Sequence, residues 1–239
     1  KEAAEYASRI DLSTVASGYY TATGAYGKGV RGGDIKYLDL NGDNIVNGGK
    51  GTLDDPGDRR VIGNSSPRYQ YGASLNFSWY GFDVSVFMQG IGRLDWYPGA
   101  DNLRFWGPYC RPYATFVPKN FMSQVWSEEN PDAYFPRARA YTSLNSNSGT
   151  AYYTNDRYLQ NLAYCRLKNL TIGYTIPRRL TSKVGIKECR IYFSGENLAT
   201  WSALKSDFLD PEQAAADSDK KANVYPWCKT YSIGLNLTF

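Results

Sequence analysis

The side chains best suited to chemistry in this sequence carry oxygen atoms at alternate positions of one short loop. The positions suited to a hard cation such as calcium or magnesium are Asp39, Asn41, Asp43, Ile45 and Asn47. Their spacing resembles ligand positions 1, 3, 5, 7 and 9 of a calcium-binding loop, where position 7 offers its backbone carbonyl. This loop is therefore the candidate metal site of the chain.

The loop departs from a calcium-binding loop at two positions. Asn44 stands where glycine is expected, although Asn tolerates a left-handed backbone. Lys50 stands at the twelfth position and cannot ligate a cation, so Asp58, further along the chain, is the candidate for the missing carboxylate. The alternative hypothesis is a loop without a metal, held by Asx turns of its own side chains.

Aromatic side chains are concentrated in the irregular stretches of the chain. Flat aromatic faces suit sugar rings, and they also pack well inside proteins and at interfaces. The candidates for substrate contact are Trp96, Tyr97, Phe105 and Trp106, with Asp101 and Arg104 as nearby hydrogen-bonding groups. The alternative is that the loop aromatics pack the loops together or against a partner; the others are Tyr109, Tyr113, Phe116, Trp126, Tyr134, Tyr152 and Tyr153.

The residue content argues against an enzyme, and no catalytic residue is proposed. The chain has no histidine, which removes the Ser-His and Cys-His arrangements of hydrolases. Its four cysteines stand far apart without a CxxC spacing, so they give no zinc or redox pattern. The net charge of +4 comes without a basic tract, so it does not indicate a nucleic-acid partner.

The elements that would hold these residues are β-strands with one apolar and one polar face. In the last strand the apolar positions are Tyr231, Ile233, Leu235, Leu237 and Phe239, which alternate strictly with uncharged polar residues. The same alternation predicts strands at 68–79, 82–90, 162–176 and 189–199. We also expect a short helix at 2–9 and a short strand at 35–40. The alternation is interrupted at Arg166, Lys168 and Asn169, where a polar contact in the barrel lumen to the plug and snorkelling at an interface both stay open.

The connections between these strands alternate in length. They are short at 80–81 and 177–187 and long at about 39–67, 91–161 and 201–226. Outer-membrane barrels show this asymmetry, with short periplasmic turns and long outside loops, although a soluble sandwich can show it as well. Five strands are too few to close a membrane barrel, so we expect other polypeptide to complete it. The start at Lys1, without Met or a signal peptide, predicts a fragment or a cleaved chain.

An ordered series of short segments resembles one protein family. The segments include Gly33 to Tyr37, Pro67 to Gly72, Arg166 to Tyr174, Glu196-Asn197-Leu198, Asp210-Pro211-Glu212 and Gly234 to Phe239. In order and spacing, residues 33–239 resemble the C-terminal part of the SusC/RagA family of TonB-linked outer-membrane transporters. In that family the segment that corresponds to the Asp39 loop usually runs directly into an Asp-Arg pair. Here Asp58-Arg59 matches that pair after an insertion that includes Gly48 to Asp55.

The resemblance implies an all-β fold, the C-terminal sector of a transmembrane β-barrel of about 22 antiparallel strands with long extracellular loops. Residues 1–32 would be the preceding barrel or loop region, and the plug domain would lie outside this chain. It also implies a SusD-like surface lipoprotein as partner, energy from the TonB complex, and residence in the outer membrane of a Gram-negative bacterium. The implied ligands are nutrient oligosaccharides, with peptides as the alternative. A soluble carbohydrate-binding β-domain is the second alternative.

Overall fold

The computed structural model describes residues 2–15, 30–110, 115, 117–139, 151–206, 209–216, 225 and 227–239. The chain divides into two compact units, which we describe separately. The loop unit comprises Lys1–Gly63, Tyr97–Leu159 and Asp217–Asn223, and the sheet unit comprises Asn64–Trp96, Gln160–Ala216 and Val224–Phe239. The predicted boundary between residues 32 and 33 is a different division, and it stays a prediction.

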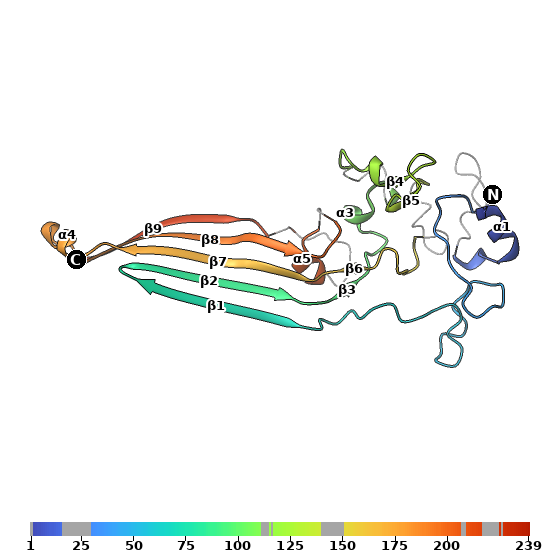
Figure 1. Cartoon of the computed structure of the whole chain (residues 1–239), viewed down its shortest axis with the longest axis horizontal. Helices are drawn as coiled ribbons and strands as arrows, with labels where there is room; N and C mark the ends of the chain where they lie inside the picture. Colours follow the sequence, from blue (N-terminus) through green and yellow to red (C-terminus); the bar gives the residue numbers. More distant parts are fainter. Residues whose placement is uncertain are drawn as a thin grey trace. The chain divides into compact units, whose positions relative to one another are not determined.

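The sheet unit is built on one antiparallel sheet of five long strands (Figure 1). The strands, in their order across the sheet, are β1 (Gln70–Trp79), β2 (Phe82–Ile91), β7 (Tyr164–Thr175), β8 (Glu188–Ser202) and β9 (Thr230–Thr238). The five predicted strands are confirmed. The tight turn between β1 and β2 has positive φ at Tyr80 and Gly81, the geometry of a type I′ hairpin whose twist matches that of the strands.

The register of the sheet aligns apolar residues with apolar residues, and polar with polar, across all five strands. One row of paired residues is entirely apolar and runs through Phe77, Val84, Ile172, Phe193 and Ile233. The neighbouring row is entirely polar and runs through Asn76, Ser85, Thr171, Ser194 and Ser232. Because successive side chains point to opposite faces of a sheet, one whole face is apolar and the other is largely polar.

The apolar face stays exposed to the surroundings of the chain. Ile233 is 83% exposed and Leu75 is 65% exposed, and Phe77, Trp79, Leu235 and Phe239 are exposed as well. A soluble sandwich would bury such a face under a second layer. The exposed apolar positions are therefore those expected of a wall that faces lipid.

A bulge explains the interrupted alternation in the strand that contains Arg166. The pairing of β7 shifts between Leu167 and Asn169 against β8, and β2 shifts opposite the same place. Arg166 and Lys168 stand two residues apart and point to the same side, where both meet the short helix α5 (Pro211–Ala216).

An ion-pair network ties α5 to the sheet. The Arg166 side chain is 1% exposed and donates to Asp210, to Glu212 at 2.8 Å and to the Thr200 hydroxyl at 2.9 Å. Lys168 Nζ donates to both carboxylate oxygens of Glu212 at 2.8 Å. These side chains therefore pair within the described chain, an arrangement that neither of the two sequence-based alternatives for this interruption specified.

The remaining elements are short. In the sheet unit they are β3 (Asp95–Trp96), β6 (Gln160–Asn161), α4 (Arg178–Thr181) and η5 (Ser182–Val184). In the loop unit they are α1 (Glu2–Arg9), α3 (Leu103–Trp106), η2 (Gly107–Tyr109), η3 (Met122–Gln124), β4 (Val125–Trp126) and β5 (Phe135–Arg137). Among the described residues, no helix is both long and apolar enough to cross a membrane.

The predicted helix at 2–9 is confirmed as α1, and the predicted strand at 35–40 is wrong. The physical reason is that side chains satisfy this backbone in place of a strand ladder. The Tyr6 hydroxyl donates to the Tyr37 carbonyl, and the Leu40 amide donates to Asp58 Oδ1 at 2.6 Å. A backbone satisfied in this way has no need of a partner strand.

Gly90 in β2 provides a sharp test of the sheet register. A Cβ at Gly90 would collide with the Tyr164 carbonyl and the Tyr71 hydroxyl, which are themselves hydrogen-bonded at 3.0 Å. We expect Gly90→Ala to destabilise the sheet by about 1–3 kcal/mol through overpacking. The measurement is the temperature at which the full-length protein in detergent loses its SDS-resistant, folded form.

Gly72→Ala in β1 is the matched control, because its Cβ would meet its nearest neighbour at 3.6 Å, an ordinary contact. Equal melting temperatures for the two variants would contradict the register of β1, β2 and β7.

Candidate functional site

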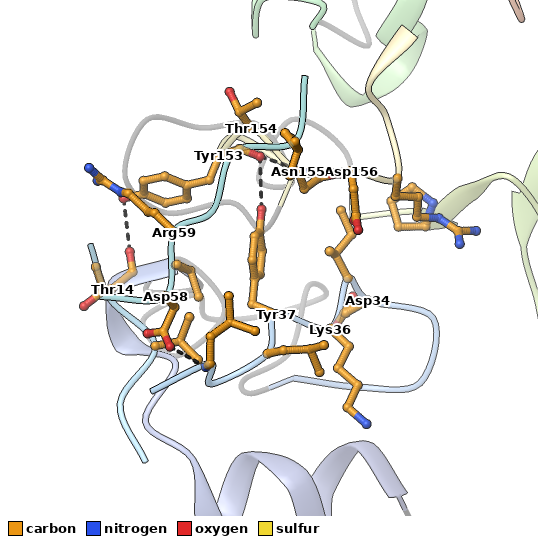
Figure 2. A pocket seen from close by; sticks show the side chains of 18 of the residues that line it. Thr14, Asp34, Lys36, Tyr37, Asp58, Arg59, Tyr153, Thr154, Asn155 and Asp156 are labelled. Atoms are coloured by element: carbon orange, nitrogen blue, oxygen red, sulfur yellow. Dashed lines mark hydrogen bonds between the residues drawn. The ribbon is translucent and has the colours of Figure 1, made fainter. Parts of the chain in front are cut away.

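The loop unit contains a cavity of about 840 Å³. Its lining comes from four stretches of the chain, at about 33–40, 46–62, 126–136 and 153–157, together with Thr14 and Val15. Figure 2 shows the side chains of Tyr37, Asp58, Arg59 and Tyr153 around this space. The lining combines aromatic rings, charged groups and backbone carbonyls, which is the composition of a site for a polar ligand.

Two tyrosines connect the stretches that line the cavity. The Tyr37 hydroxyl donates to the Tyr153 carbonyl at 3.1 Å, and the Tyr153 hydroxyl donates to the Thr14 carbonyl at 3.1 Å (Figure 2). Each bond joins segments more than one hundred residues apart in sequence. The cavity is therefore a product of long-range contacts between loops.

A packed aromatic cluster supports one wall of the cavity. It consists of Tyr97, Phe105, Trp106, Tyr109, Phe121, Tyr134, Phe135 and Tyr158, with ring centroids 4.8–6.5 Å apart between neighbours. Rings at such separations and mostly tilted angles attract each other beyond the area they bury. Phe135 belongs both to this cluster and to the cavity lining.

Tyr97 links the cluster to the cavity wall. Its hydroxyl donates to the Ala151 carbonyl at 3.1 Å and accepts from Asn155 Nδ2 at 2.9 Å. Burial raises the pKa of the Tyr97 hydroxyl well above its ordinary value, so it stays a neutral donor. These bonds hold the segment from Ala151 to Asn155 in place, and residues 153–155 of it line the cavity.

A buried ion pair fixes the start of the 33–40 stretch of the cavity lining. Arg139 Nη2 donates to Asp34 Oδ2 at 2.6 Å, and the Asp34 side chain is 0% exposed. The same oxygen accepts the Arg31 amide at 2.8 Å. Burial raises the pKa of the Asp34 carboxyl, outweighing the lowering effect of that amide and of Arg139.

The residues predicted to contact substrate are distributed between packed and exposed positions. Trp96 is buried in the sheet unit, and Tyr97, Phe105 and Trp106 are buried in the aromatic cluster. Asp101 and Arg104 are exposed beside it. None of these six described residues lines the cavity. This packing matches the alternative that aromatics hold the loops together, and the substrate contact stays a prediction.

The other loop aromatics divide in the same way. Trp126 and Tyr153 line the cavity, and Tyr152 is exposed with its ring against Tyr153. Tyr113 and Phe116 lie outside the described residues. The sequence reasoning missed Tyr37 as a lining residue, since a lone tyrosine in a short predicted strand gave no signal for a cavity formed by distant loops.

The candidate cation loop is held by its own side chains. Asp39 accepts the amides of Gly42 and Asn44 at 2.7 and 2.8 Å, and Asp43 Oδ1 accepts the Ile45 amide at 2.8 Å. These are the Asx turns of the alternative hypothesis. The described residues contain no group of three or more His, Cys, Asp or Glu side chains placed to hold a metal.

The two asparagines and Asp58 of the candidate set are engaged in the same manner. Asn41 and Asn47 accept the amides of Asp43 and Gly49 at 3.0 and 2.6 Å. Asp58 accepts the amides of Leu40 and Asn47, and so ties the two ends of the loop together. The loop therefore closes without an ion, and a bound calcium or magnesium stays a prediction.

Comparisons with known proteins find similarity to TonB-dependent receptors and to a peptide transporter. No protein-family profile matches the chain. TonB-dependent receptor P26 of Formosa agariphila is 28% identical over 215 residues, 87% of this chain, and TonB-dependent receptor P3 of the same bacterium is 27% identical over 217 residues, also 87%. The solved structure of the RagAB peptide transporter superposes with a TM-score of 0.55 over 76% of this chain at 25% identity.

The predicted relationship to TonB-dependent outer-membrane receptors is confirmed. The predicted antiparallel all-β class is confirmed as well, with RagA-type barrel proteins as structural neighbours, and the closure of a barrel stays a prediction. The chain spans about a fifth of the length of these relatives: 20% and 19% of the two receptors and 18% of the matched transporter chain. The activity and ligands of a whole receptor are therefore matters for proposal.

The contact between Gly33 and Trp126 in the cavity lining can be tested by substitution. Gly33 has a φ of 87°, and a Cβ there would collide with the Trp126 ring. Gly42 has a similar φ of 81°, but a Cβ there would meet nothing within 4 Å. Both alanine variants carry the strain of a left-handed backbone, so we expect Gly33→Ala to cost about 1–3 kcal/mol more than Gly42→Ala.

The measurement is the rate of limited proteolysis of the loop unit in the full-length protein, supported by its tryptophan fluorescence. Equal protection of the two variants would mean that Trp126 does not pack on Gly33.

The two hypotheses for the Asp39 loop predict different responses to calcium. Because its oxygens already accept backbone amides, we expect calcium and chelator to give the same melting temperature. We expect Asp43→Asn, which keeps a side-chain oxygen, to cost no more than about 1 kcal/mol. A calcium-dependent rise in the wild-type melting temperature that Asp43→Asn abolishes would instead establish the cation.

Proposed function

We propose that this chain forms wall strands and outside loops of a TonB-dependent transporter that imports nutrient oligosaccharides across the outer membrane. In this proposal the barrel works in complex with a SusD-like surface lipoprotein and draws energy from the TonB complex through parts of the receptor beyond these residues. The observation that carries the proposal is the exposed apolar sheet face, backed by a polar face, in a chain similar to TonB-dependent receptors.

The dimensions of the sheet support a membrane wall. β1 and β2 each have 10 residues. Ten extended residues span about 34 Å, and a strand tilt of about 40° reduces this to a height of about 26 Å, close to the roughly 25 Å apolar band of outer-membrane barrels. The strands are therefore long enough to cross the hydrocarbon layer.

The edges of the sheet support the need for more polypeptide. β1 and β9 are the two edge strands. In lipid, each unpaired backbone N–H or C=O group would cost several kcal/mol, so both edges need partner strands. The remainder of the barrel supplies them in this proposal, and the plug fills the interior.

The cavity of the loop unit supports contact with a polar ligand. Tyr37, Trp126 and Tyr153 contribute aromatic surface, and Thr154, Arg59 and the backbone contribute hydrogen-bonding groups. Flat aromatic surface with nearby polar groups suits the apolar faces and hydroxyls of sugar rings. An oligosaccharide is therefore our first candidate ligand.

A peptide is the second candidate ligand. Two observations favour it: the similarity to a structure described as a peptide transporter, and the Arg60–Asp156 ion pair at 3.1 Å in the cavity lining. Charged groups of both signs suit the charged termini and side chains of peptides. A soluble carbohydrate-binding domain is disfavoured by the exposed apolar face. Catalysis is not proposed, because the relatives are receptors and a transporter.

A filled cavity tests whether the loop unit contacts the ligand. Thr154 lines the cavity and is exposed within it, so we expect Thr154→Trp in the full-length transporter to weaken ligand binding ~10-fold or more by occupying the space. The measurement is isothermal titration of the purified complex with an oligosaccharide that supports growth only when the transporter gene is intact.

Thr52→Trp is the control, because Thr52 is also exposed and lies outside the cavity lining. Equal affinity for the two variants would remove the cavity from the proposal. Recovery of the full-length protein from the soluble fraction without detergent would overturn the membrane role altogether, and binding of peptides alone would establish the second candidate.

A further inference from the structure

The connection between β7 and β8 is a compact structured turn. α4 (Arg178–Thr181) continues directly into η5 (Ser182–Val184), and the turn ends at Gly185 with a φ of 77°. The Leu180 amide donates to the Pro177 carbonyl at 2.9 Å, and the Ile186 amide donates to the Thr181 carbonyl at 3.2 Å. Thr181 is buried at its centre. The turn therefore presents its outer side chains from a fixed backbone.

The outer side chains of this turn are basic and apolar. Arg178, Arg179 and Lys183 are exposed, and none of them forms an ion pair within the described part of the chain. Leu180 in α4 and Val184 in η5 are 60% and 70% exposed. A soluble surface has no need for this combination of unpaired cations and exposed aliphatic groups.

A fourth basic residue, Lys187, lies at the end of the sheet, between the turn and β8. Lys187 Nζ donates to the Phe239 carbonyl at 2.8 Å, and the Lys187 amide donates to the Thr238 carbonyl at 2.8 Å. These bonds tie the turn to the last strand. The turn thus adjoins the exposed apolar face, to which Phe239 and Leu237 contribute.

The turn lies at the end of the sheet where aromatic residues gather. Figure 1 shows α4 at the same end of the strands as the β1–β2 turn and residue 239. Trp79 and Tyr80 pack edge to face there with centroids 5.1 Å apart, and Phe82 packs on Tyr174 at 4.5 Å. Aromatic girdles mark the boundary between hydrocarbon and head groups in outer-membrane barrels. The basic turn follows immediately beyond that boundary.

We propose that residues 178–187 form a docking surface for anionic phospholipid head groups in the leaflet that surrounds this end of the barrel. Arg178, Arg179 and Lys183 contact the lipid phosphates, and Leu180 and Val184 enter the boundary between head groups and acyl chains. Guanidinium and ammonium groups form charge-assisted hydrogen bonds with phosphate, and exposed aliphatic side chains anchor basic segments at the interface. The occupant follows from charge complementarity and from continuity with the lipid-facing sheet.

The inference rests on the membrane placement in the proposed function and is independent of the imported ligand. The test compares the full-length transporter with the triple variant Arg178→Gln/Arg179→Gln/Lys183→Gln in nanodiscs of mixed phosphatidylglycerol and phosphatidylethanolamine. After stepwise delipidation, mass spectrometry measures the ratio of the two lipids retained. We expect the triple variant to lower the ratio of phosphatidylglycerol to phosphatidylethanolamine ~10-fold, since each basic residue near a surface contributes to anionic lipid binding.

The matched control is Lys50→Gln/Lys119→Gln/Lys229→Gln, which removes three exposed cations from outside the turn. We expect it to retain the wild-type ratio, and Leu180→Ser/Val184→Ser to lower the retention of both lipids equally. An unchanged ratio in the basic-turn variant, or an equal loss in the control, would overturn the proposal.

Two further outcomes would also overturn it. Displacement of phosphatidylglycerol by inorganic phosphate would indicate a site for free phosphate, and a soluble protein that binds the wild type but not the triple variant, with lipid ratios unchanged, would indicate a protein partner. Failure of the wild type to enter nanodiscs would contradict the proposed function itself, which separates the two cases.

Discussion

The pairing of every strand backbone with its neighbours is the constraint on which the sheet unit depends. Lipid offers no hydrogen bonds to a backbone, so the N–H and C=O groups of a membrane wall must pair within the sheet. The antiparallel ladders from β1 to β9 meet this demand, and they set the register that gathers apolar residues on one face and polar residues on the other. The regular pairing of β7 with β8 shifts at the bulge between Leu167 and Asn169. Next to this bulge, Arg166 forms its ion pair with Glu212 of α5.

In the loop unit, side chains form many of the hydrogen bonds that the backbone N–H and C=O groups require. Its long connections form few strand ladders, and side chains satisfy much of the backbone: Asp39, Asp43 and Asp58 accept amides, while Tyr37 and Tyr153 donate to carbonyls. The aromatic cluster around Trp106, which is 0% exposed, supplies the apolar core that such loops otherwise lack. A cavity can persist between these loops because both of its walls are held by buried contacts.

The candidate site shows how packing redistributes residues of one chemical type. Sequence position favoured Phe105 and Trp106 over Trp126 and Tyr153 as substrate contacts, although all four are aromatic residues in long connections. In the structure the first two fill the core of the loop unit and the second two line the cavity. Whether a ring is buried or lines the cavity depends on the distant segments that it contacts, and the local sequence around the ring does not indicate those contacts.

The strands, their two-sided character and the relationship to TonB-dependent receptors could all be predicted from the order of residues alone. A period of two residues is a local property, and the strict alternation from Tyr231 to Phe239 is enough to define a face before any partner strand is known. The pairing order of the strands, the ion-pair network of Arg166 and the cavity lined by Tyr37 and Tyr153 arise from contacts between segments far apart in sequence, so they became visible in the folded chain. The predicted strand at 35–40 failed for the same reason: its backbone groups bond to Tyr6 and Asp58, and contacts over such distances in sequence are set by the folding of the whole unit.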